Sequence, residues 1–133
     1  MGAKNHGIIM PDADKEDALN ALVNAAFGAS GQRCMALSTV VFVGESANWI
    51  EELIPKAKSF KIGAGNEAGI DLSPVCYKEL KERIVGLIKG ASKEGAKVIL
   101  DGSDYVDPKY PKGNFIAPTI IDHVGENMEC YKQ

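Results

Sequence analysis

The sequence has few of the residues that build disulfide frameworks and metal sites. Its 133 residues include two histidines and three cysteines, the latter at positions 34, 76 and 130. An odd number of widely spaced cysteines matches neither a disulfide framework nor a CxxC metal site. We therefore expect reduced thiols, a reducing compartment and no bound metal.

Long apolar runs and clusters of basic residues are also missing. No stretch approaches the roughly 20 apolar residues that span a bilayer, and the N-terminus lacks the charged and apolar regions of a signal peptide. The formal net charge is -3 and the lysines are dispersed, whereas a nucleic-acid surface needs a clustered basic patch. We therefore expect neither a membrane nor a nucleic acid as a partner.

The remaining composition is that of an ordinary globular chain. Hydrophobic residues make up 45% and charged residues 25% of the sequence, which is typical of a folded domain. The length lies in the range of a single domain that can bury a core. We find no internal repeat and no interdomain linker.

Strand and helix patterns alternate along the first half of the chain. The predicted elements are a short buried strand over residues 7–10, a helix capped by Asp12 or Asp14 and extending to Phe27, a central strand over 38–43, and a helix over about 46–59. Gly28 and Gly31 end the first helix and leave Cys34 on the turn that follows. Pro55 predicts a bend in the second helix or a later start.

The second half continues the alternation. Its predicted elements are a loop over 63–69, a helix that begins at Ser73-Pro74 and ends at Gly95, a strand over 97–100, a surface loop over 103–114, and a strand over 115–121. Serine followed by proline is a common helix start, and Pro118 indicates an edge position or a bulge in the last strand. Strands separated by helices favour an α/β fold with a mostly parallel sheet flanked by helices.

Cys34 is the residue most suggestive of chemistry. It follows Arg33 in the run 31–36, and an adjacent guanidinium favours the thiolate, which is the reactive form of cysteine. A lone cysteine is also a common buried apolar residue. Charge alone therefore favours a structural role for Cys34.

The residues around Cys34 favour the catalytic role instead, because together they resemble a known sequence region. The segments concerned are 2–7, 8–14, 26–28, 31–39, 93–96, 113–119 and 127–132. They resemble the aldehyde dehydrogenase superfamily, most closely its CoA-acylating branch that acts on methylmalonate semialdehyde. The resemblance covers nearly the whole chain. It implies that residues 1–133 are a partial, nucleophile-bearing catalytic domain and that the cofactor-binding domain is absent from this chain.

The resemblance also implies a mechanism. Cys34 would be the catalytic nucleophile that attacks a small semialdehyde, NAD would accept the hydride, and CoA would take up the thioester after loss of CO2, giving propionyl-CoA or acetyl-CoA. The Cys34 N–H is a candidate donor to the oxyanion. Arg33 would grip the substrate carboxylate, for which a guanidinium offers two parallel hydrogen bonds. Acidification of Cys34 is the other role open to Arg33.

No residue of this chain is predicted to hold NAD, CoA or a metal, and the fragment alone is expected to be inactive. Gly63, Gly65 and Gly69 miss the spacing of the dinucleotide fingerprint by one residue. By resemblance the full-length protein is a homo-oligomer. A bacterial cytoplasm and a mitochondrial matrix both fit, and malonate and methylmalonate semialdehyde are not distinguished.

Other candidate residues favour structural roles. Lys4, Asn5 and His6 are interpreted as structural hydrogen-bonding residues at the start of a strand and are left outside the site. His123 follows an apolar strand and is interpreted as a surface or packing histidine. Two other functions stay open: a non-catalytic fold module or oligomerisation partner in which Cys34 is vestigial, and an independent cysteine hydrolase.

Overall fold

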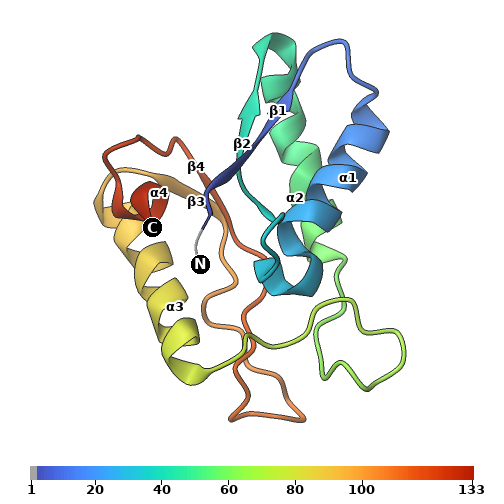
Figure 1. Cartoon of the computed structure of the whole chain (residues 1–133), viewed down its shortest axis with the longest axis vertical. Helices are drawn as coiled ribbons and strands as arrows, with labels where there is room; N and C mark the ends of the chain where they lie inside the picture. Colours follow the sequence, from blue (N-terminus) through green and yellow to red (C-terminus); the bar gives the residue numbers. More distant parts are fainter. Residues whose placement is uncertain (1–2) are drawn as a thin grey trace. The chain divides into compact units, whose positions relative to one another are not determined.

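The chain divides between Lys61 and Ile62 into two units, each with its own helices and its own two-stranded sheet. The structure is a computed structural model that describes residues 3–133 (Figure 1). Gly2, the first residue of the family-like segment 2–7, lies outside the described residues. The α/β class predicted from the sequence is confirmed, since both units combine helices with a pair of strands.

The first unit is built on a parallel pair of strands. Its elements are β1 (Asn5–Ile9), α1 (Lys15–Phe27), the 3-10 turn η1 (Gly28–Gly31), β2 (Leu37–Phe42), the 3-10 turn η2 (Gly44–Trp49) and α2 (Ile50–Lys58). The pairing is parallel because α1 provides the crossover that parallel strands need. The predicted parallel arrangement is confirmed here. Within residues 3–133 β2 pairs only with β1, so its predicted central position is not seen.

Helix α1 forms where the sequence predicts it. The Asp14 side chain accepts a hydrogen bond from the backbone N–H of Asp17 at 3.0 Å, which satisfies one of the unpaired donors of the first turn. Leu19, Leu22 and Val23 recur at helical spacing and are buried. The cap therefore sets where the helix begins, and its apolar face makes the core of the first unit.

Helix α2 begins at Ile50, after η2, rather than near Ser46. This later start is one of the two outcomes predicted from Pro55, which lies inside α2. Ser46 is buried, and its Oγ lies 2.9 Å from the carbonyl oxygens of Ile9 and Val43. This hydroxyl ties the end of β1 to the start of η2 and keeps the chain out of the α-helix at that point.

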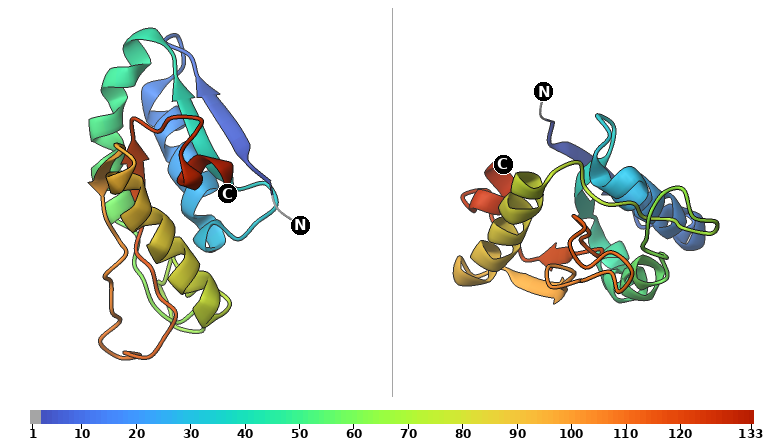
Figure 2. Two further views of the ribbon diagram at one scale, coloured as in Figure 1. Left: turned by 90° about the vertical axis from the view of Figure 1, so that its left-hand side faces the viewer. Right: turned by 90° about the horizontal axis from the view of Figure 1, so that it is seen from below.

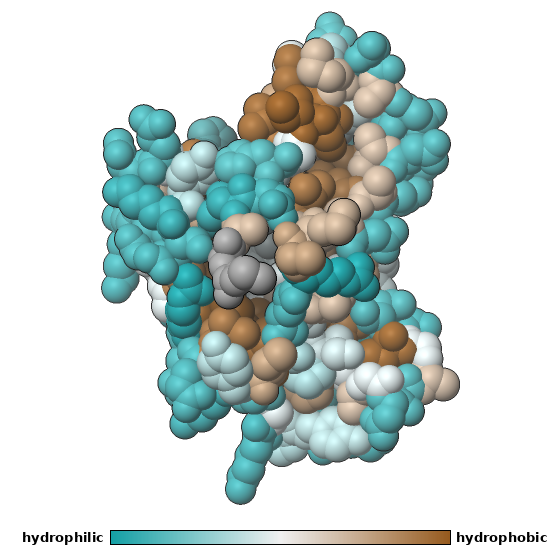
Figure 3. All heavy atoms as spheres, in the orientation of Figure 1, coloured by the Kyte–Doolittle hydropathy of each residue, from teal (hydrophilic) through white to brown (hydrophobic). Residues whose placement is uncertain are grey.

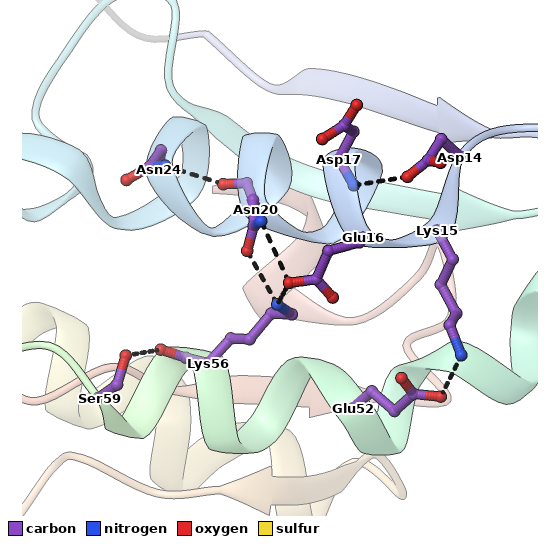
Figure 4. Close-up of polar contacts among 9 residues, drawn as sticks. All are labelled: Asp14, Lys15, Glu16, Asp17, Asn20, Asn24, Glu52, Lys56 and Ser59. Carbon is purple, nitrogen blue, oxygen red and sulfur yellow. Dashed lines mark hydrogen bonds and ion pairs between the residues drawn. The ribbon is translucent and has the colours of Figure 1, made fainter.

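Polar contacts join the two helices of the first unit (Figure 4). The Lys56 ammonium lies 2.6 Å from Glu16 Oε1 and 2.9 Å from Asn20 Oδ1, while Lys15 pairs with Glu52 at 2.8 Å. The hydrogen bond from Lys56 holds the pKa of Glu16 below its ordinary 4.5. All four charged groups are partly or largely exposed, so these ion pairs orient the helices more than they stabilise them.

The second unit contains α3 (Lys78–Lys93), β3 (Lys97–Leu100), β4 (Ile120–Asp122) and α4 (Glu129–Lys132). Helix α3 contacts β3 and α4, and Figure 2 shows it from two further sides. Strands β3 and β4 pair antiparallel, unlike the first pair. The reason is their connection, a long loop with no helix, which imposes no crossover.

Two predictions in the second unit are wrong. The helix expected from Ser73-Pro74 begins only at Lys78. Leu72 and Val75 are buried, and the Val75 N–H donates to the Asn114 carbonyl at 3.0 Å, so this segment is extended and anchored. The strand expected over 115–121 is present only from Ile120.

The segment before β4 is irregular because its polar and aromatic groups are engaged elsewhere. The Phe115 ring is buried and stacks with the Tyr110 ring at a centroid distance of 6.3 Å, and the Ala117 N–H donates to the Gly102 carbonyl at 3.1 Å. The loop 103–114 has no helix or strand, as predicted. It is not wholly a surface loop, however, because Ser103 and Asp107 are buried.

Apolar side chains remain exposed over β1 and β2 (Figure 3). Ile8 is 67% exposed and Met10 and Val41 are exposed as well. Between residues 3 and 133 none of the helices combines the length and the apolar character needed to cross a bilayer.

The burial of α1 yields a stability prediction. Leu19 is completely buried, so Leu19→Ala removes packed methyl groups and leaves a cavity, which we expect to lower the free energy of unfolding by about 2–5 kcal/mol. The exposed Ile8→Ala is the matched control, with an expected change within about 0.5 kcal/mol. Urea denaturation followed by circular dichroism measures both. Equal effects of the two variants would contradict the assigned core.

The Lys56–Glu16 pair yields a pH prediction. A carboxyl group whose pKa is lowered on folding contributes stability above its ordinary 4.5, and this contribution is lost as the pH falls through the lower folded value. In Lys56→Met we expect the Glu16 pKa, followed by carbon NMR, to return toward 4.5 and the urea midpoint to fall less on acidification. Lys58→Met, in the same last turn of α2, is the control and should leave the Glu16 titration unchanged.

Candidate functional site

Cys34 lies at the centre of a tight turn between α1 and β2. The Ala36 N–H donates to the Arg33 carbonyl at 3.1 Å, which makes residues 33–36 a hydrogen-bonded turn with Cys34 and Met35 in its central positions. Cys34 is exposed, and Met35 is 80% exposed. The predicted placement of Cys34 on an exposed turn after the first helix is confirmed.

The chain reaches this turn through a left-handed segment. Ala29, Ser30 and Gly31 have φ values of 53°, 55° and 69°, so three consecutive residues lie in the left-handed region. Glycine adopts this conformation readily, but for Ala29 and Ser30 it costs roughly 1–2 kcal/mol each. The Gln32 N–H donates to the Ala29 carbonyl at 3.0 Å and closes the segment. The backbone is therefore strained at Ala29 and Ser30, a few residues before the cysteine, and such strain is often associated with a functional site.

The Arg33 side chain extends back to the end of α1. A Cβ built on Gly28 would lie 3.0 Å from Nη1 and 3.4 Å from Cζ of Arg33. The guanidinium therefore fills the space that a side chain at position 28 would need, next to the helix C-terminus, where partial negative charge favours a cation. Arg33 is exposed, and it has no ion pair within the described part of the chain. Its fork of donors is open to an anionic ligand.

Asn5, the first residue of β1, binds the turn of residues 33–36. Its Nδ2 donates to the Cys34 carbonyl at 2.7 Å and to the Ala36 carbonyl at 2.9 Å. The prediction that Asn5 is a structural hydrogen-bonding residue agrees with these two contacts. A polar amide at a strand start, where asparagine is depleted, was the available signal. Nothing local in the sequence indicates its partners.

The turn also fixes the direction of the Cys34 amide. The C=O and N–H of a trans peptide point in opposite directions, and the structure has no cis peptide among the residues it describes. Because the Arg33 carbonyl points to Ala36, the Cys34 N–H points out of the turn. It makes no hydrogen bond with any residue from 3 to 133. An outward N–H beside an exposed thiol is an arrangement that suits an oxyanion on an attacked carbonyl.

The remaining sequence candidates have structural surroundings. His6 Nδ1 lies 2.8 Å from the Lys4 carbonyl, as expected for a structural histidine. His123 belongs to the second unit, has a φ of 57°, and places Nδ1 3.0 Å from Asp122 Oδ2 on the surface. Cys76 is exposed and Cys130 half-buried. The contacts of His6 with the Lys4 carbonyl and of His123 with Asp122 give the hydrolase hypothesis no support.

The glycine loop 63–69 does not fit a dinucleotide. The Ile70 side chain would lie 2.6 Å from a Cβ on Gly63, and Ser73 Oγ would lie 2.9 Å from one on Gly65. The space next to these glycines is thus filled by the chain itself, whereas a phosphate-binding loop keeps it open for the ligand. In the described part of the chain no group of three or more potential metal ligands is assembled either.

A polar cluster anchors this glycine loop instead. Glu67 Oε1 lies 2.5 Å from Lys109 Nζ and accepts a hydrogen bond from the Tyr110 hydroxyl at 2.8 Å. Hydrogen bonds from Lys109 and then Tyr110 hold the pKa of Glu67 below its usual range, and Glu67 in turn raises the pKa of Lys109. The cluster joins two loops of the second unit, which is a structural role.

The chain is similar to known proteins over its whole length. The sequence model of the "Aldehyde dehydrogenase family" matches residues 1–133. The chain is 54% identical over its whole length to the human mitochondrial methylmalonate-semialdehyde/malonate-semialdehyde dehydrogenase [acylating] and 56% identical to the methylmalonate-semialdehyde dehydrogenase [acylating] of Arabidopsis thaliana. It spans 25% and 22% of these two relatives, so about a quarter of their length.

Solved structures of similar enzymes superpose on nearly the whole chain. A methylmalonate-semialdehyde dehydrogenase from Oceanimonas doudoroffii superposes with a TM-score of 0.94 at 40% identity, over 99% of this chain and 28% of that one. The NAD+ complex of an aldehyde dehydrogenase from Bacillus cereus superposes with a TM-score of 0.89 at 32% identity, over 99% of this chain and 26% of that one. The predicted resemblance is confirmed.

Proposed function

Since the chain belongs to the aldehyde dehydrogenase family, we propose that it is the nucleophile-bearing part of a CoA-acylating semialdehyde dehydrogenase. The observation that supports this most directly is Cys34, exposed at the centre of its turn with its N–H directed outward and Arg33 beside it. Relatives above 50% identity are named methylmalonate-semialdehyde or malonate-semialdehyde dehydrogenases. The alternative of a fold module with a vestigial cysteine gains no support from this geometry.

The proposed step carried by this chain is covalent capture of the aldehyde. The Cys34 thiolate attacks the carbonyl carbon, a carbon–sulfur bond forms, and the carbonyl electron pair moves to oxygen. The Cys34 N–H then donates to that oxyanion. Oxidation by NAD, loss of CO2 and transfer to CoA belong to the proposal for the whole enzyme, and no residue described in this chain is assigned to hold either cofactor.

Arg33 is proposed to bind the carboxylate of the semialdehyde. Its guanidinium is exposed beside the end of α1, and a planar fork matches the two oxygens of a carboxylate. Gly28 leaves the guanidinium in this place undisturbed, because a Cβ at position 28 would lie 3.0 Å from Nη1. Acidification of Cys34 is the competing role, and kinetics separate the two.

The domain organisation, assembly and compartment of the whole enzyme are proposals of the same kind. Because the chain spans about a quarter of its curated relatives, we propose that residues 1–133 are a partial catalytic domain, that turnover needs the cofactor-binding domain, and that the whole enzyme is a homo-oligomer. The named relatives include mitochondrial enzymes and the solved ones include bacterial enzymes. A mitochondrial matrix and a bacterial cytoplasm therefore both remain proposed compartments.

A chimaera tests the proposed function. The 133-residue chain replaces the matching 28% of the Oceanimonas doudoroffii enzyme, and NADH formation is followed with malonate and methylmalonate semialdehyde in the presence of CoA. We expect turnover by the chimaera and none by the chain alone. Cys34→Ala should reduce kcat by at least about 10⁴-fold, with Cys76→Ala as the control. A Cys34→Ala chimaera that keeps its activity would refute the proposal.

The role of Arg33 is tested in the same chimaera with two substrates. Losing a charge-assisted contact worth about 1.5–3 kcal/mol raises KM about 10- to 100-fold, and we expect this from Arg33→Gln with malonate semialdehyde. Propanal, which has no carboxylate, should show little change. Equal losses on both substrates, together with a shifted pH profile of Cys34 alkylation, would instead assign Arg33 to thiol activation.

A further inference from the structure

The amide of Asn5 makes contacts that the proposed mechanism has not used. Resting on the proposed function, we propose that Asn5 is a positioning residue. Its side chain holds the turn of residues 33–36, so that Cys34 attacks a carbonyl with its own N–H aligned on the oxyanion. Asn5 touches no reacting atom. It acts through the backbone of Cys34.

The Asn5 amide uses its full donor capacity on the turn. The Nδ2 amide has two hydrogens, and both have acceptors on the turn, the carbonyl oxygens of Cys34 at 2.7 Å and Ala36 at 2.9 Å. These two carbonyls bracket Met35, which is 80% exposed and has no packing to hold it. The turn depends on hydrogen bonds for its conformation because it is on the surface.

Asn5 lies at the end of the paired part of the sheet. Asn5 is the first residue of β1 and lies opposite Leu37, the first residue of β2, and the register shifts directly after this pair. The carbonyls of Cys34 and Ala36 thus lie beyond the end of the β1–β2 ladder. The Asn5 side chain continues hydrogen bonding to the chain where the backbone of β1 no longer does. Bulges next to active sites commonly redirect chains in this manner.

The Asn5 contact also restricts the backbone conformation of Cys34. The peptide before Cys34 is fixed by the bond from the Ala36 N–H to the Arg33 carbonyl, and the peptide after it is fixed by the bond from Asn5 to the Cys34 carbonyl. The φ and ψ angles of Cys34 are the rotations between these two peptide planes. Fixing both planes fixes the direction in which Cβ leaves the backbone, and with it the relation between the thiol and the outward N–H.

A comparison of two reactions of Cys34 tests this role. Alkylation by iodoacetamide is a displacement at carbon that forms no oxyanion. Acylation by p-nitrophenyl acetate adds the thiolate to a carbonyl, forms the carbon–sulfur bond, and releases p-nitrophenolate with the electron pair of the broken carbon–oxygen bond. The second reaction alone uses the aligned N–H. The ratio of the two rate constants therefore reports positioning independently of how exposed or ionised the thiol is.

The experiment uses the 133-residue chain with Cys76→Ser and Cys130→Ser, so that Cys34 is the only thiol. We expect Asn5→Ala and the isosteric Asn5→Asp to lower the acylation rate at least tenfold and the alkylation rate less than threefold. Ser38→Ala is the matched control, because Ser38 bonds the Asn5 carbonyl at 3.4 Å from the same strand pair without contacting the turn. Its ratio of rate constants should be unchanged.

Amide hydrogen exchange gives a readout that needs no reaction. We expect the Ala36 N–H to exchange at least tenfold faster in Asn5→Ala, while the amides of α1 keep their exchange rates. A variant with an unchanged rate ratio and unchanged Ala36 exchange overturns the role of Asn5. If the unsubstituted chain is alkylated but never acylated, the proposed function of Cys34 fails, and Ala36 exchange still decides whether Asn5 holds the turn.

Discussion

The parallel pairing of β1 with β2 is the constraint on which the candidate site depends. Asn5 and Cys34 are 29 positions apart, and no local turn can join them. The pairing does so by placing the first residue of β1 opposite Leu37, three positions after the cysteine. The crossover through α1 makes this pairing possible, and α1 is held by its buried apolar face. A hydrophobic helix face remote from the chemistry thus determines which backbone carbonyls Asn5 can reach.

The parts of the fold that depend on neighbouring residues could be predicted from the sequence. The cap at Asp14 and the helix end at Gly28 use side chains or conformations within one turn of the boundary. The local sequence pattern was therefore sufficient to predict where α1 begins and ends. The start at Ser73-Pro74 failed because the deciding contact, from Val75 to Asn114, joins residues far apart in the sequence. The strand before Ile120 failed for the same reason, since Ala117 bonds Gly102 rather than a strand.

In the candidate site, too, the residues with a local sequence signal were predicted and the residue with distant partners was not. Cys34 and Arg33 were predicted because the arginine, the cysteine and the glycines around them lie within one short run, and the structure places that run on an exposed turn. Asn5 was left outside because its significance lies in which carbonyls it meets, and this follows from the register of two strands. Composition and spacing do not contain that register, which a one-residue slip would change completely.

Under the proposed function, this chain separates the two halves of an aldehyde oxidation. Covalent capture needs a nucleophile, an oxyanion donor and a grip on the substrate, and Cys34, its N–H and Arg33 supply these within two consecutive residues. Oxidation needs a hydride acceptor held over the resulting adduct, and Gly63 and Gly65 of loop 63–69 are instead covered by the side chains of Ile70 and Ser73. Capture is therefore a property of local geometry, sensitive to the two peptide planes around Cys34. Oxidation is a property of the larger assembly, and so chemistry at the sulfur can be measured apart from turnover.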